Sequence, residues 1–178
     1  FTITLPVLLG YIPLGITFGF LMVSQGIAWY IPILFSIFVF AGAAQFLAVG
    51  LVVNHASLLD TAIATFLINL RHVFYGLSLF DFLPHTWAKR LYFMFGITDE
   101  TYSLLTSSKS ANPSNALPIV ALNQSYWVAG TAIGALLATS LPPIKGIEFS
   151  LTALFVILLV EQIRANHETK TILERGLA

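Results

Sequence analysis

The sequence predicts an all-α protein, a polytopic bundle of about five or six membrane-spanning helices. Of its 178 residues, 57% are hydrophobic and 9% are charged, whereas about a quarter of the residues in soluble domains are charged. The hydrophobic residues also gather into long runs, as spanning helices of about 20 residues require. We therefore predict one transmembrane domain at residues 1–165, with room for broken or re-entrant helices, and a polar tail at 166–178.

Short connections separate the runs, which lie at residues 3–23, 31–53, 62–80, 91–107, 117–141 and 147–160. Prolines and glycines interrupt the first run, and charged pairs interrupt the third and fourth. The last run is shorter than a span, so it is predicted either as a longer helix extended at both ends or as a re-entrant piece. Before the third run, Ser57-Leu-Leu-Asp60 resembles a capping box that opens the helix.

The charged pairs are the main functional signal. Arg71-His72 lies at the middle of the third run, and Asp99-Glu100 lies at the middle of the fourth. A charge at the bilayer centre costs roughly 3 kcal/mol, so such residues persist mainly where they face a partner, a cavity or a substrate. Opposite charges at equal depth predict that Arg71 approaches Asp99 or Glu100. This pattern favours a transporter, while a permanent ion pair that locks two helices together is the alternative.

Composition excludes several other classes of protein. The net charge is zero, which disfavours nucleic-acid binding, and there are no cysteines for thiol catalysis or disulfides. The motifs HExxH and GxSxG are absent. We therefore predict no enzymatic activity, no catalytic residue, no metal site and no cofactor. A channel, or a non-transporting membrane subunit of a larger complex, remains the alternative function.

Four motifs carry a resemblance to a known family: PVLLGYIPLGITFGF, FAGAAQFLAVG, TFLINLRHVFYGLSL and FGITDETYSLL. Together they resemble the AzlC family of bacterial inner-membrane proteins, over nearly the whole chain. The resemblance implies a multi-pass secondary transporter that exports leucine, isoleucine, valine and their analogues, together with a small membrane partner of the AzlD type. It also implies a further hydrophobic segment beyond this sequence.

An amino acid in a bilayer needs partners for both of its charges. Arg71 can offer a planar fork of donors to the carboxylate, and Asp99 or Glu100 can accept from the ammonium. Aromatic residues of the runs could form an apolar wall for the side chain: Phe40, Phe46, Phe66, Phe74, Phe95 and Tyr75. Because histidine changes its charge near neutral pH, His72 is the first candidate for proton coupling, with the two carboxylates next. Its alternative role is helix packing.

Three further polar residues are predicted to contact the substrate. On an unbroken helix Asn69 shares a face with His72, whereas Tyr75 shares a different face with Arg71. A single site containing all four requires a helix break near Leu70, where no proline or glycine marks one. Gln45 follows the small residues AGAA and could contact the substrate or bond across helices.

Two stripes of small residues lie on the first and fifth runs. They are Gly15-x-x-x-Gly19 and Gly130-x-x-x-Gly134. Such stripes let helices approach closely. They are predicted as docking surfaces for a helix of the small partner.

Overall fold

The computed structural model describes residues 2–107 and 111–142 and the isolated positions 146, 149, 152 and 156. Most of the sixth run (147–160), the tail (166–178) and the predicted boundary at residue 165 lie outside this part. The chain divides into two compact units, residues 1–143 and 144–178. Every element named below belongs to the first unit and is helical, as the sequence predicts.

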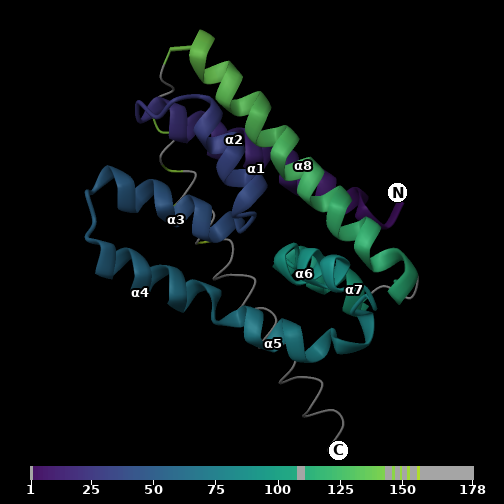
Figure 1. Cartoon of the computed structure of the whole chain (residues 1–178). Coiled ribbons are helices and arrows are strands. Elements are labelled where there is room, and N and C mark those ends of the chain that lie inside the picture. Colours follow the sequence, from purple (N-terminus) through teal and green to yellow (C-terminus); the bar gives the residue numbers. More distant parts are fainter. Residues whose placement is uncertain are drawn as a thin grey trace, which may run out of the picture. The chain divides into compact units, whose positions relative to one another are not determined.

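The helices α1 (Leu5–Ser24) and α8 (Pro113–Ser140) pack along each other and form the scaffold (Figure 1). Their two glycine stripes face one another. A Cβ atom added at Gly15 would lie 2.8 Å from the carbonyl oxygen of Trp127, and one added at Gly130 would lie 2.7 Å from that of Ile12. The prediction that these stripes dock a partner's helix is therefore wrong, because each stripe is covered by the other.

The second run is predicted as one segment at residues 31–53, but the structure divides it into two helices. The helices α2 (Tyr30–Phe38) and α3 (Gly42–Val53) are separated by a break at which Phe40 has a φ of 38°. This left-handed conformation is held by packing, since the Phe40 side chain is buried. Gly42 then lets the Trp127 ring come close, because a Cβ atom there would lie 3.2 Å from the ring.

The third run also contains two helices, α4 (Leu58–Asn69) and α5 (Arg71–Ser78), followed by the 3₁₀ turn η2 (Phe80–Phe82). The predicted cap is confirmed, since the Ser57 hydroxyl accepts from the Asp60 N–H at 3.1 Å. A break is also present at Leu70, as a single site with Arg71 and His72 would require. At the break, backbone hydrogen bonds join residues three apart instead of four. One of them runs from the Val73 N–H to the Leu70 carbonyl and measures 3.1 Å.

The fourth run is divided between α6 (Trp87–Phe95) and α7 (Asp99–Ser107). At the break, Gly96 lies so near α8 that any Cβ atom there would collide with the side chain of Val120. Thr98 precedes α7, and its hydroxyl accepts from the Thr101 N–H at 3.3 Å. Packing against α8 therefore replaces a continuous helix with two short ones.

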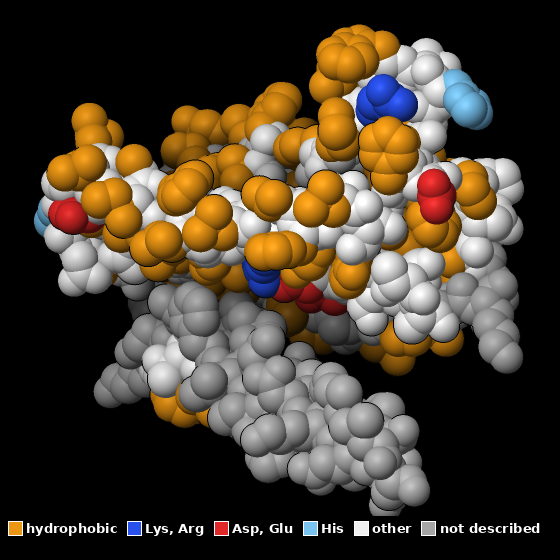
Figure 2. Space-filling view, turned by 90° about the horizontal axis from the view of Figure 1, so that it is seen from below, with side chains coloured by type: hydrophobic (Ala, Val, Ile, Leu, Met, Phe, Trp, Pro, Cys, Tyr) orange, Lys and Arg blue, Asp and Glu red, His pale blue; other side chains and the backbone are white. Residues whose placement is uncertain are grey.

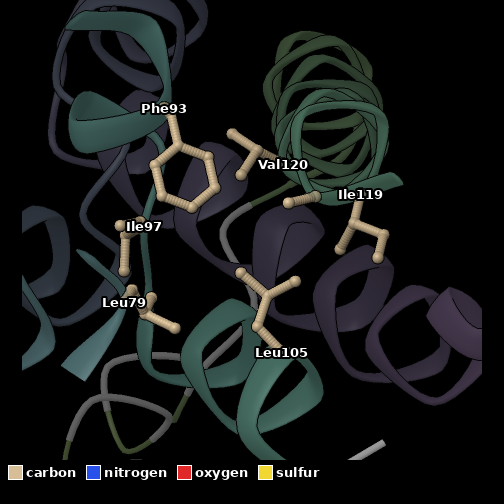
Figure 3. Packing of buried hydrophobic residues seen from close by; sticks show 7 residues of the cluster. Leu79, Phe93, Ile97, Leu105, Ile119 and Val120 are labelled. Atoms are coloured by element: carbon tan, nitrogen blue, oxygen red, sulfur yellow. The ribbon is translucent and has the colours of Figure 1, made fainter. Parts of the chain in front are cut away.

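A buried apolar cluster fixes the α6–α7 break against the scaffold. Figure 3 shows Phe93 and Ile97 from the break region facing Ile119 and Val120 of α8, with Leu79 and Leu105 nearby. These side chains are almost fully buried. Because these side chains pack together away from water and lipid, the break is held in one position against α8.

Only one helix of the described residues, Leu5–Ser24, is long and apolar enough to cross a membrane alone, and Gly42–Val53 is a shorter apolar helix. The helices α4 and α5 bury none of their residues. Leu58, Leu77 and Phe74 expose 91%, 75% and 69% of their surface, and Figure 2 shows a face rich in hydrophobic side chains. Such surfaces are typical of contact with lipid or another protein.

Candidate functional site

The breaks in the second, third and fourth runs are linked to one another around Tyr11 of α1. The Tyr11 ring packs edge-on against Phe40 at the first break, with ring centroids 6.4 Å apart. The Tyr11 hydroxyl lies 2.6 Å from the Thr98 hydroxyl at the α6–α7 break. Arg71, at the start of α5, reaches Asp99 at the start of α7. Interrupted helices whose breaks meet in this way are typical of transporter binding sites.

The predicted ion pair between the two central charged pairs is confirmed for Asp99. Nη1 of Arg71 donates to Oδ2 of Asp99, and the Tyr75 hydroxyl donates to the other oxygen, Oδ1, at 2.5 Å. The side chains of Arg71 and Asp99 expose 31% and 32% of their surface. Nε of Arg71 is buried and has no partner in the described part of the chain. The guanidinium thus has a donor available for another acceptor.

Glu100 faces away from this ion pair. The Tyr11 hydroxyl donates to Oε2 of Glu100 at 2.6 Å. Successive residues on a helix point about 100° apart, so Asp99 faces α5 while Glu100 faces α1. No cationic side chain among the described residues lies within ion-pair distance of Glu100. Of the two adjacent carboxylates, only Asp99 is neutralised.

Hydroxyl groups extend from Glu100 towards the scaffold. The Thr98 hydroxyl, beside Tyr11, donates to the Thr101 hydroxyl at 3.2 Å, and Nδ2 of Asn123 donates to the Thr101 hydroxyl at 2.9 Å. Asn123 is fully buried, yet its Oδ1 lacks a hydrogen-bond donor within the described residues. A buried acceptor without a donor is costly. Asn123 therefore meets this cluster through its amide nitrogen and leaves its oxygen as an unsatisfied acceptor.

Asn69 and His72 lie beside the break at Leu70. The Asn69 amide donates to the Thr65 carbonyl at 2.9 Å, so it turns back along its own helix. Nδ1 of His72 lies 3.2 Å from the Asn69 carbonyl, and the His72 ring is 5.5 Å from the Tyr75 ring. His72 and Tyr75 are neighbours because they lie three residues apart on α5, while no described contact joins the Asn69 amide to Arg71. Their roles in binding and proton coupling stay predictions.

Gln45 belongs to a second polar network. It is fully buried, donates to the Ser36 hydroxyl at 3.0 Å and accepts from Nε1 of Trp127 at 2.8 Å. The Ser36 hydroxyl lies 2.9 Å from that of Thr131. These bonds join α2 and α3 to α8, as expected for the interhelical alternative. A substrate contact for Gln45 stays a prediction.

The aromatic residues separate into two groups. Phe40 and Phe46 are buried, whereas Phe66 and Phe74 expose 66% and 69% of their surface and form no wall with described residues. Sequence reasoning missed Tyr102, whose ring stacks on Tyr75 with centroids 4.5 Å apart. It also missed Tyr11, Thr98, Thr101 and Asn123. These residues could have been found in the sequence, because they place hydroxyl and amide groups within the hydrophobic runs.

A separate cavity of about 400 Å³ lies between α2, α3 and α4. Its walls are mostly apolar, and their polar members are Thr61, Thr65 and His55. Neither Arg71 nor Asp99 lines it. It therefore lacks the paired charges that a zwitterion requires.

Comparison with known proteins gives a consistent family match. The family model described as "AzlC protein" matches residues 6–141. An "uncharacterized membrane protein" of Helicobacter pylori J99 is 36% identical over 172 residues, covering 94% of this chain and 75% of the relative. The "branched-chain amino acid transport protein AzlC" of Bacillus subtilis 168 is 35% identical over 167 residues, covering 91% and 66%. The "inner membrane protein YgaZ" of Escherichia coli K12 is 30% identical over 165 residues, covering 86% and 67%. No solved structure matches the chain.

Proposed function

The chain belongs to the AzlC family and is a membrane transport protein, and we propose that it exports branched-chain amino acids across the inner membrane. The substrate class follows that of the Bacillus relative, whose name specifies branched-chain amino acid transport. In this proposal the chain works as a secondary transporter by alternating access. Proton movement drives the export, and a titratable group in the spans carries the proton.

The ion pair between Arg71 and Asp99 carries this proposal. The pair contains one positive and one negative group, and a free amino acid carries the same two charges as its ammonium and its carboxylate. A zwitterion can replace it by placing its carboxylate on Arg71 and its ammonium on Asp99. The exchange leaves the net charge of the site unchanged, and the pair can form again after release. The Arg71 side chain is 31% exposed, which supports the first step, because an incoming carboxylate can approach the guanidinium before Asp99 is displaced.

Aromatic rings beside the ion pair suit a branched aliphatic side chain. The stacked Tyr75 and Tyr102 rings lie next to Asp99. Phe40 and Phe95, with centroids 6.4 Å apart, lie at the first and third breaks. The faces of such rings cover apolar surface, and the Tyr75 hydroxyl is already bonded to Asp99. The geometry thus supports an apolar rather than a charged side chain.

A small AzlD-like membrane subunit is the proposed partner. The covered glycine stripes leave it no surface between α1 and α8. The uncovered apolar side chains of α4 and α5 offer a larger surface. Full export by the chain without any partner would show that the subunit is not required.

The proposal is tested with the purified protein in proteoliposomes, with and without the small subunit, under an imposed proton gradient. A carrier shows saturable leucine counterflow. Arg71→Lys keeps the charge but loses the fork, so leucine affinity should fall by about tenfold or more. Arg90→Lys is the matched control, because Arg90 also has a buried Nε without a partner in the described part but lies outside the ion pair.

Three results would contradict this function. Leucine binding by Arg71→Lys equal to that of the parent would leave the Arg71–Asp99 pair as a structural lock between helices. Flux without saturation or counterflow would favour a channel. No flux under any condition, with the partner present, would favour a non-transporting subunit.

A further inference from the structure

The first turn of α7 carries two sites rather than one. Asp99 belongs to the ion pair with Arg71, whereas Glu100 is joined to Tyr11 of α1 and through hydroxyls to Asn123 of α8. Glu100 is exposed, and Asn123 is fully buried. A continuous line of hydrogen-bonding groups therefore leads from an accessible carboxylate into the scaffold.

We propose that Glu100 is the group that takes up the coupling proton, with Tyr11 as its positioning residue. This inference rests on the proposed proton-driven export and names the residue that couples it. Glu100 has no cation partner among the described residues. A lone carboxylate inside a span is costly unless it is neutralised. A proton neutralises it without any rearrangement of the helices.

Short hydrogen bonds hold the Glu100 carboxylate at the end of this polar cluster. The Tyr11 hydroxyl lies 2.6 Å from both the Glu100 carboxylate and the Thr98 hydroxyl, within the range of O–H···O hydrogen bonds. Tyr11 donates its own hydrogen to Oε2 of Glu100, so it positions the carboxylate, and a proton taken up by Glu100 is an additional one.

The groups that face Glu100 define how the proton affects substrate binding. Tyr11 faces it from α1, Asp99 precedes it on α7, and Arg71 and Tyr75 of α5 lie beyond Asp99. With Glu100 ionised, these groups carry one surplus negative charge, which attracts the substrate's ammonium. With Glu100 protonated, the Arg71–Asp99 pair is neutral and complete. Proton and substrate therefore compete, as an exchanger of inward protons for outward amino acids requires.

Proton uptake is measured without substrate, so that this test does not depend on the proposed substrate. The Trp127 ring lies 5.3 Å from the Tyr11 ring and reports on it. The exposed Trp29 and Trp87 are first replaced by Phe in the whole chain. Trp127 fluorescence is then followed over about pH 4 to 8 in detergent micelles. We expect one transition in this parent and its loss in Glu100→Gln.

Two further variants separate a proton site from a folding defect. Tyr11→Phe keeps the ring and its packing but loses the hydroxyl, and it should move the transition by about one pH unit. His85→Gln, in an exposed loop, is the control and should leave it unchanged. In a second arm, leucine affinity of the parent should rise about tenfold as Glu100 ionises, and Glu100→Gln should remove this pH dependence.

Several outcomes overturn the inference. The inference fails if the transition persists in Glu100→Gln or is unmoved in Tyr11→Phe. It also fails if the transition disappears in His72→Gln, which would make His72 the carrier. Dependence on a sodium gradient at constant pH would identify a different coupling ion. Loss of leucine binding in Arg71→Lys alongside an unchanged transition in Glu100→Gln would leave the proposed function intact while rejecting Glu100.

Discussion

At the scale of single residues, the two adjacent carboxylates have different surroundings. Asp99 uses both of its oxygens, one on Arg71 and one on Tyr75, while Glu100 has only the Tyr11 hydroxyl as a described partner. The described polar partner of Glu100 lies on α1, and those of Asp99 lie on α5. One turn of helix therefore holds a neutralised and an uncompensated charge side by side.

The Arg71–Asp99 pair should be detectable as an energetic coupling. Either Arg71→Gln or Asp99→Asn leaves an uncompensated charge in the span and should lower stability. The double variant should be more stable than the two single losses predict, by about 1–2 kcal/mol, since both side chains are partly exposed. Thermal unfolding of the four proteins in detergent measures this coupling. Additive losses would mean that the pair does not form.

At the scale of elements, close packing against α8 decides where the helices break. Val120 occupies the space beside Gly96, and the Trp127 ring occupies the space beside Gly42. Both glycines lie next to a break. Residues of α8 thus hold the α2–α3 and α6–α7 breaks, while α1 supplies Tyr11 between them.

Glycine substitutions within α1 should separate packing from helix propensity. Gly15→Ala places a Cβ atom 2.8 Å from the Trp127 carbonyl, so the backbones must move apart at a cost of about 1–3 kcal/mol. Gly10→Ala, on the same helix, meets nothing within 4 Å and should be neutral or slightly stabilising. Thermal unfolding compares the two variants. Equal stability would argue against the interlocked stripes.

At the scale of the whole molecule, Arg71 and Tyr75 of the candidate site lie in the α4–α5 span, whose two helices bury none of their residues against described ones. Both α4 and α5 pack with their outer sides uncovered, and the match to relatives extends over about three quarters of the Helicobacter protein's length. Lipid, the proposed small subunit or further chain can cover that side. Movement of this span relative to the α1–α8 scaffold is the simplest route to alternating access.

Alternating access can be followed by thiol labelling, because the chain contains no cysteine. Asn69→Cys, beside the break, should react with a membrane-impermeant reagent applied from either side of the membrane. Leucine should slow the reaction. Leu59→Cys is the control, since an apolar surface position with 69% exposure should face lipid, where the reactive thiolate does not form. Labelling of Asn69→Cys from one side only would contradict alternating access.

The sequence by itself determined the membrane class, the all-helical content, the cap at Ser57 and the approach of Arg71 to the acidic pair. The first three of these features are local, because hydrophobicity, capping and charge are properties of neighbouring residues. The sequence also indicated that a break near Leu70 was required for one site.

Only the tertiary structure decided which carboxylate Arg71 would meet, because Asp99 and Glu100 differ by 100° on one helix turn. It also placed Gln45 in a packing network, paired the two glycine stripes with each other and introduced the breaks at Phe40 and Gly96. Each of these outcomes depends on contacts with α1 or α8 that are distant in the sequence. Such contacts arise from complementary side-chain volumes, which a single sequence does not reveal.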